Sequence, residues 1–184
     1  MALTKVQAEG INLADTFAFT GAITGVGVSN LQMFRINADI SSTTSPTTIT
    51  AYTDAHDSSG FKRVGTAWSV SSGVFTPSAS GLYEVNFTAD MRSNAEVRYC
   101  QFDFYFSTNS GGAYTIHTMY SCIPYLNSTT TYSGVTFSRY YNIADASTFR
   151  MYFKFSAHNT SAVIRGGSSN DLSMIVFKRL ADAQ

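Results

Sequence analysis

Paired carboxylates are the most general catalytic chemistry to look for, but this chain has only three glutamates, Glu9, Glu84 and Glu96. Glu84 shares one face of an alternating stretch with Asp90. An extended chain separates these two carboxylates by about 20 Å, at about 3.3 Å per residue. The two carboxylates of a glycosidase must lie roughly 5 to 9.5 Å apart, so these two are too far apart to form such a pair. We predict that the chain is not an enzyme and that it uses no cofactor. A pair formed across a subunit boundary, as in a surface-sugar hydrolase, is the least favoured alternative.

The three histidines are isolated from one another in the sequence, at His56, His117 and His158. His56 has acidic neighbours on both sides, and Asp54 would project with it from an extended chain. Hard cations need more oxygen ligands than this loop offers. We therefore predict a solvated loop and no metal site.

Tyrosine-rich loops offer a different chemistry, the contact of flat rings and hydrogen-bonding groups with a sugar. Such residues dominate adaptable binding surfaces. The candidates that the sequence provides are Tyr114, Tyr125, Asn127, His158 and Asn159. We interpret them as candidate glycan contacts, and ordinary loop packing remains the alternative.

Charge is low and balanced along the chain, which narrows the possible partners. Charged residues make up 13% of the sequence, and the formal net charge is +0. Because the twelve Lys and Arg residues are scattered, we expect no nucleic-acid partner. No apolar run approaches the ~20 residues of a membrane helix, and the first ten residues lack the apolar region of a secretion signal. We expect synthesis in a cytoplasm and no membrane insertion, with a lost leader as the alternative.

Two cysteines, Cys100 and Cys122, are too few for a disulfide framework. They could pair if their strands are neighbours. Two buried thiols are the favoured interpretation, because free cysteine behaves as a small apolar residue.

Strict alternation of apolar and polar residues positions these groups on strands. In the stretch that follows Gly81, the residues that share one face are Tyr83, Val85, Phe87, Ala89 and Met91. A period of two places such a set in a core. About ten stretches of this kind recur, with turn residues between them and no convincing helix. The pattern predicts an all-β jelly-roll sandwich over residues 31–184, with residues 156–170 as loop.

The stretch Trp68–Phe87 also carries a family resemblance. Its spacing of aromatic and glycine residues resembles the signature of the C1q-like members of the C1q/TNF superfamily, and the tail 168–177 is similar to the closing strand of that family. The sequence departs from the pattern at Arg63 and Val85. The resemblance implies a trimeric jelly roll in which the signature and core positions are Trp68, Phe75, Gly81, Tyr83, Phe87 and Phe177.

Several strands carry aromatic residues on both faces, and only one face can enter the core of a sandwich. The other face must meet something, and an oligomer interface is the economical explanation. We predict that Tyr105, Tyr140 and Tyr152 lie in a trimer interface. The surplus of rings and the family resemblance agree on this point.

Residues 1–30 differ from the rest, because they are rich in glycine and cannot bury a core by themselves. They resemble N-terminal segments of bacteriophage tail-fibre and other virion proteins. The apolar residues Leu13, Phe17 and Phe19 are the candidates for docking onto a particle. A flexible leader is the alternative interpretation.

The resemblances together imply a bacteriophage virion structural protein, a tail fibre or head fibre. It would attach by residues 1–30 to other virion proteins, lie exposed on the particle and mediate adhesion to a host surface or glycan. Two alternatives remain open: a capsid-decorating protein that binds no receptor, and a non-viral C1q-like extracellular binding module.

Overall fold

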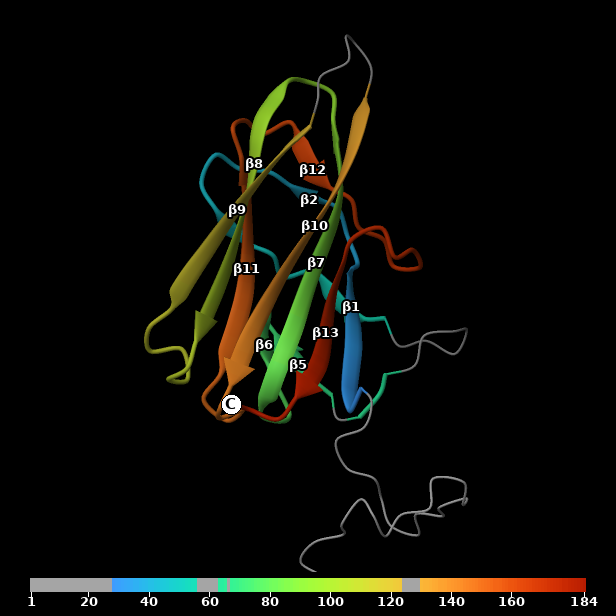
Figure 1. Ribbon diagram of the computed structural model, residues 1–184. Helices are drawn as coiled ribbons and strands as arrows, with labels where there is room; N and C mark the ends of the chain where they lie inside the picture. The colour runs from blue at the N-terminus through green and yellow to red at the C-terminus, as the bar shows by residue number, and fades with distance from the viewer. Residues whose placement is uncertain (1–27, 56–62, 66, 124–129) are drawn as a thin grey trace, which may run out of the picture.

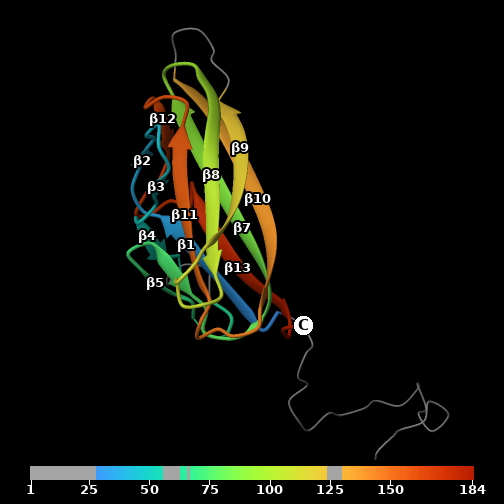
Figure 2. The same ribbon diagram turned by 90° about the vertical axis from the view of Figure 1, so that its left-hand side faces the viewer.

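The chain forms a two-layer β-sandwich (Figures 1 and 2). The computed structural model describes residues 28–55, 63–65, 67–123 and 130–184, and within them it has thirteen strands and no helix. The described residues therefore contain no helix that could cross a membrane. Neighbouring strands are antiparallel throughout the described pairs, as short connections between sequential strands favour.

The first layer, here the β7 sheet, is built around the longest central strand. Its order is β2 (Ile40–Ser41), β12 (Ala162–Ile164), β7 (Gly81–Ser93), β13 (Met174–Ala181), β1 (Asn30–Ile36) and β4 (Tyr52–Asp54). β12 and β13 lie end to end along one side of β7, where they pair with residues 91–93 and 82–88. β10 (Thr131–Ile143) pairs with the whole of the other side of β7.

The second layer, here the β8 sheet, packs against the first. Its order is β5 (Ser69–Ser71), β6 (Val74–Thr76), β11 (Arg150–Ala157), β8 (Val97–Ser107) and β9 (Thr115–Ile123). β3 (Thr47–Thr48) also pairs with β11. The predicted all-β jelly roll is confirmed.

Alternation along β7 sets the position of the core, as the sequence predicts. Every second residue from Gly81 to Ser93 is buried, and the residues between them are not. Rings from the β8 sheet meet this row; the Phe87 ring, for example, lies 5.6 Å from that of Phe102 and 5.4 Å from that of Phe153. Fully burying one such side chain contributes about 1.5–3 kcal/mol, so the aromatic layer is the main stabilising element of the sandwich.

The aromatic residues of the family signature lie together in this core. The Trp68 ring stacks on Phe177, with centroids 4.0 Å apart, and meets Tyr83 edge-on at 5.2 Å. All five of these rings are at most 2% exposed: Trp68, Phe75, Tyr83, Phe87 and Phe177. The signature therefore marks the point where the two sheets are joined by stacked rings.

Gly81 allows the chain to cross from one sheet to the other. β6 ends in the β8 sheet and β7 begins in the β7 sheet, so residues 77–80 form the crossing. Gly81 has φ +153, and a Cβ there would lie 2.4 Å from Nε of Arg179 and 2.8 Å from the carbonyl oxygen of Ala181. A side chain would displace both contacts, which explains why glycine occupies this position.

The observed strands exceed the roughly ten expected from the pattern, and the additional ones are very short. The region 156–170, expected to be loop, contains the three-residue strand β12. Strands of two or three residues are too short to show alternation, so a sequence pattern does not reveal them.

The cysteine prediction is correct for Cys100 and wrong for Cys122. Cys100 is fully buried, and burial together with the nearby Cys122 raises the pKa of its thiol to about 12. Cys122 is exposed, and both thiols are free. The reason is alternation along β9: Ser121, opposite Cys100, and Ile123 face inward, so Cys122 faces out.

Candidate functional site

Two long strands, β9 and β10, lie at the same side of the sandwich and each has one free edge. β9 pairs with β8 and β10 pairs with β7, and among the described residues neither strand has a second partner. The two strands approach each other at both ends. Ser133 Oγ donates to the carbonyl of Cys122 at 3.2 Å, and the Tyr141 hydroxyl lies 3.4 Å from Nδ1 of His117. Unpaired backbone groups along such edges are ready to pair with or to be covered by another chain.

Four side chains between these two strands are only half-buried, although they alternate inward like core residues: His117, Met119, Val135 and Phe137. We call this side of the molecule the open edge and define it by these four residues together with Arg139, which is exposed. The Phe137 ring rests on Phe102 with centroids 5.1 Å apart, yet it keeps part of its surface exposed. The equivalent inward row of β7 is fully buried. The core of the sandwich is therefore fully buried along β7 but only partly covered between β9 and β10.

His117 is the titratable group of the open edge. Its ring lies 5.2 Å from that of Phe106 and stacks at 6.0 Å on that of Tyr141. Burial and the positive charge of Arg139 lower the pKa of His117 below its ordinary 6.5. Burial also raises the pKa of Tyr141 to about 12. Both groups are held neutral at physiological pH.

The outer face of the β7 sheet is mostly polar and includes the trimer candidate Tyr140. Tyr140 is 63% exposed on β10. Its pairing partner on β7, Glu84, lies 3.7 Å from the amine of Lys178 and accepts a bond from Ser138 at 3.4 Å. Tyr140 therefore stands as an exposed ring on a polar surface beside the open edge.

The other two trimer candidates lie on the opposite outer face, that of the β8 sheet. Tyr105 and Tyr152 pair across β8 and β11, and their rings stack with centroids 4.6 Å apart. Tyr114 meets Tyr152 edge-on at 4.8 Å, and the amine of Lys154 sits 4.9 Å above the Tyr105 ring. The three trimer candidates thus do not form one surface, and two of them cover each other within one chain.

The ligand-loop candidates fall at two ends of the β8 sheet. Tyr114 joins the Tyr105–Tyr152 pair, whereas His158 contacts Tyr99, six residues and about 20 Å along β8. Tyr99 and Tyr120 leave 43% and 61% of their surfaces exposed.

Asn159 is committed to its own loop, since its amide donates to the Glu96 carbonyl at 2.6 Å and its oxygen accepts from the amide of Ser161. The remaining candidates lie outside the described residues: Tyr125, Asn127, Leu13, Phe17 and Phe19.

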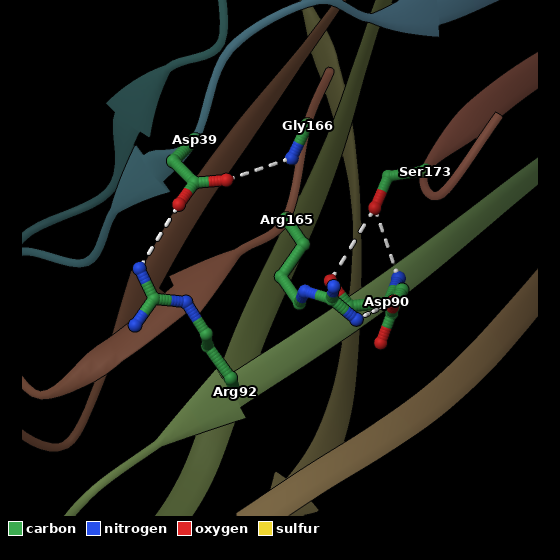
Figure 3. A network of polar contacts seen from close by, with 6 residues as sticks. All are labelled: Asp39, Asp90, Arg92, Arg165, Gly166 and Ser173. Carbon is green, nitrogen blue, oxygen red and sulfur yellow. Dashed lines mark hydrogen bonds and ion pairs between the residues drawn. The ribbon is translucent and has the colours of Figure 1, made fainter. Parts of the chain in front are cut away.

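A polar network that sequence reasoning missed ties the loop after β12 to the outer face of β7 (Figure 3). Its members come from four separate parts of the chain: Asp39, Asp90, Arg92, Arg165, Gly166 and Ser173. Arg165 and Asp90 form an ion pair at 2.7 Å, and Asp39 accepts from Arg92 and from the Gly166 amide at 3.0 Å each. Burial opposes ionisation of Asp39, but the Gly166 amide and Arg92 outweigh it and lower the pKa of this carboxyl. No local sequence signal connects residues so far apart.

The acidic side chains first considered for catalysis are engaged in ion pairs. Glu84 pairs with Lys178, and Asp90 pairs with Arg165. Over the ranges that the structure describes, no group of three His, Cys, Asp or Glu side chains lies together as metal ligands would. His56 lies outside those ranges.

The strand order, the aromatic joint between the sheets and the crossing at Gly81 define a jelly roll of the TNF/C1q-like class. The resemblance of Trp68–Phe87 to the C1q/TNF superfamily is thus confirmed as a likeness of fold, whereas residues 1–27 of the virion-like segment 1–30 lie outside the described residues. No protein-family model and no curated protein sequence matches the chain.

Among solved structures, Eiger TNF from S. frugiperda aligns with 84% of this chain and 94% of its own, at 13% identity and a TM-score of 0.52. Murine APRIL aligns over 82% and 98% of the two chains, at 9% identity and a TM-score of 0.49. The PRD1 vertex protein P5 aligns over 84% and 99%, at 17% identity and a TM-score of 0.45. At identities this low, the likeness shows the fold alone.

Proposed function

We propose that this chain is a bacteriophage virion structural protein that assembles as a homotrimer through its open edge. Residues 1–30 would attach it to other virion proteins, through Leu13, Phe17 and Phe19. The jelly roll would be displayed on the particle surface and bind a host-surface glycan. The phage assignment rests on the resemblance of residues 1–30 to virion proteins, and the number of three copies rests on the C1q-like signature.

The open edge is the observation that carries the assembly. Two adjacent free edges of nine and thirteen residues, with half-buried Met119, Val135 and Phe137 between them, need a cover. Completing the burial of each such side chain would contribute about 1 kcal/mol, roughly half of the value for full burial. A second copy of the chain can cover the edge of the first, and closed symmetry then repeats the contact around a ring.

The structure also suggests which predicted tyrosine joins this interface. Tyr140 stands exposed on the edge strand β10, so we place it in the trimer contact. Tyr105 and Tyr152 lie on the far face beside Tyr114. In this arrangement they stay outside the trimer and are available to a glycan.

Light scattering on the purified chain tests the assembly, with two tyrosine variants as a matched pair. Tyr140→Lys is expected to give a folded monomer, because a charge would be buried in each of three contacts. Tyr99→Lys, which changes an exposed tyrosine of the other outer face, is expected to remain a trimer. A monomeric wild-type chain, or a Tyr140→Lys variant that still forms trimers, would contradict the proposed assembly.

The docking and adhesion parts need separate experiments. Because β1 begins at Asn30, the deletion should remove residues 1–27, and the truncated trimer should no longer join particles. Normal incorporation of truncated protein would exclude the docking role. Binding on a glycan array would support adhesion; an array without binding would favour the second candidate, a capsid-decorating protein that binds no receptor.

A further inference from the structure

His117 occupies the one part of the core-facing surface that the proposed trimer would complete. Its ring lies between the free edges of β9 and β10, with the Tyr141 hydroxyl 3.4 Å from Nδ1. The ring is half-buried in the single chain. A partner that covers Met119 and Phe137 would remove the remaining water from His117 as well.

We propose that assembly through the open edge is acid-sensitive and that His117 is the group responsible. The inference rests on the proposed trimer and adds a regulation to that same contact. The trimer forms while His117 is neutral and dissociates when His117 takes up a proton.

The groups that face His117 favour its neutral form. From β8 it meets Phe106, which carries no charge, and from β10 it meets Tyr141 and the cationic Arg139. Arg139 pairs in register with the apolar Val85 of β7. None of the ion pairs within the described residues gives His117 a carboxylate partner. A proton on His117 therefore meets one positive charge and no negative one.

Association would strengthen this preference, because covering the edge removes water from a site that already disfavours the charged imidazole. Each copy must then release a proton to assemble in acid. By linkage, one such group lowers the association constant about tenfold for each pH unit below its free pKa, and three copies together about a thousandfold. The effect falls below pH 6.5, the ordinary pKa of histidine, because the pKa of His117 is already lowered in the single chain.

Sedimentation of the full-length chain at about pH 8 and about pH 5 tests the inference. The wild-type chain should be a trimer at the higher pH and should dissociate at the lower one, with its circular dichroism spectrum unchanged. His117→Gln, which keeps a polar side chain without a titrating proton, should be a trimer at both. His158→Gln changes a histidine outside the open edge and should dissociate in acid as the wild-type chain does. Arg139→Gln should raise the pKa of His117 and move the dissociation to higher pH.

The outcomes separate this inference from the proposed function. A wild-type chain that is monomeric at both pH values overturns the trimer and the pH dependence with it. A wild-type trimer that persists at the lower pH overturns the role of His117 and leaves the trimer intact. Equal acid sensitivity of His117→Gln and wild type does the same.

Discussion

Gly166 is a position where a single methyl group should damage the fold. It lies in the polar network of Figure 3, directly against the backbone of Ala38. A Cβ at Gly166 would lie 2.3 Å from the carbonyl oxygen of Ala38, 2.5 Å from its carbonyl carbon and 2.7 Å from its nitrogen. All three atoms belong to the backbone, so no side chain can rotate away. In Gly166→Ala the segment must move as a whole.

The hydrogen bonds that such a movement breaks set the magnitude. The Gly166 amide donates to Asp39 at 3.0 Å, and the amide of Gly167 donates to the carbonyl of Ile36 at 2.9 Å. Each bond contributes about 0.5–1.5 kcal/mol. With the strain of the shifted backbone, we expect a loss of about 2–4 kcal/mol in the free energy of unfolding. In a chain of this size, 1 kcal/mol corresponds to roughly 2–4 °C, so Tm should fall by roughly 4–16 °C.

The adjacent glycine provides the control for this experiment. A Cβ at Gly167 would meet its nearest atom, Cβ of Asn170, at an ordinary 3.6 Å. Gly167→Ala should therefore leave Tm within about 2 °C of the wild-type value. Both variants are compared by thermal unfolding at one chain concentration, because the proposed assembly would make Tm concentration-dependent. Equal Tm values for the two variants would refute the close approach of Gly166 to Ala38.

Two further predictions concern titratable groups. In the native chain the thiol of Cys122 should react rapidly with a thiol reagent at about pH 8. Cys100 should react only on unfolding, because its buried thiol resists ionisation. Two rapidly reacting thiols would contradict the inward position of Cys100. Asp39→Asn should lower the free energy of unfolding at neutral pH by up to about 1 kcal/mol, since its partners are largely solvated. The pKa of Asp39 is depressed below 3.8, so its contribution is present above that pH and lost as pH falls through the folded-state pKa. Urea unfolding of both chains should therefore show a difference that closes in strong acid, and a constant difference would exclude the ionic contribution.

Alternation explains why the sequence predicts the core so well. On β7, β8 and β11 the apolar rows are long enough to show a clear period of two, and these rows are buried except for the half-buried Phe106 at the end of β8. Alternation does not predict strands that are too short to show a period, nor contacts between segments that are far apart in the sequence. β12 is too short to show a period, and the network of Asp39, Arg165 and Gly166 joins segments more than a hundred residues apart.

The surface was harder to predict, because alternation assigns a residue to a face without saying what covers that face. Tyr105, Tyr140 and Tyr152 are all outward-facing, as predicted, but they divide between two opposite faces of the sandwich. The open edge was missed because its apolar residues have the sequence pattern of core residues. Met119, Val135 and Phe137 alternate inward like core residues, and they stay half-exposed because no further strand of the described ranges lies beside β9 and β10.

This division of the aromatic residues constrains how copies of the chain can assemble. The open edge lies between the two sheets, and Tyr140 stands beside it on the outer face of the β7 sheet. A partner seated there leaves the β8 sheet uncovered, with the stacked Tyr105–Tyr152 pair at one end and the exposed Tyr99 and Tyr120 at the other. One face would then serve assembly and the other would serve recognition. The contrast between Tyr140→Lys and Tyr99→Lys tests that separation directly, because the first should abolish the trimer without the second affecting it.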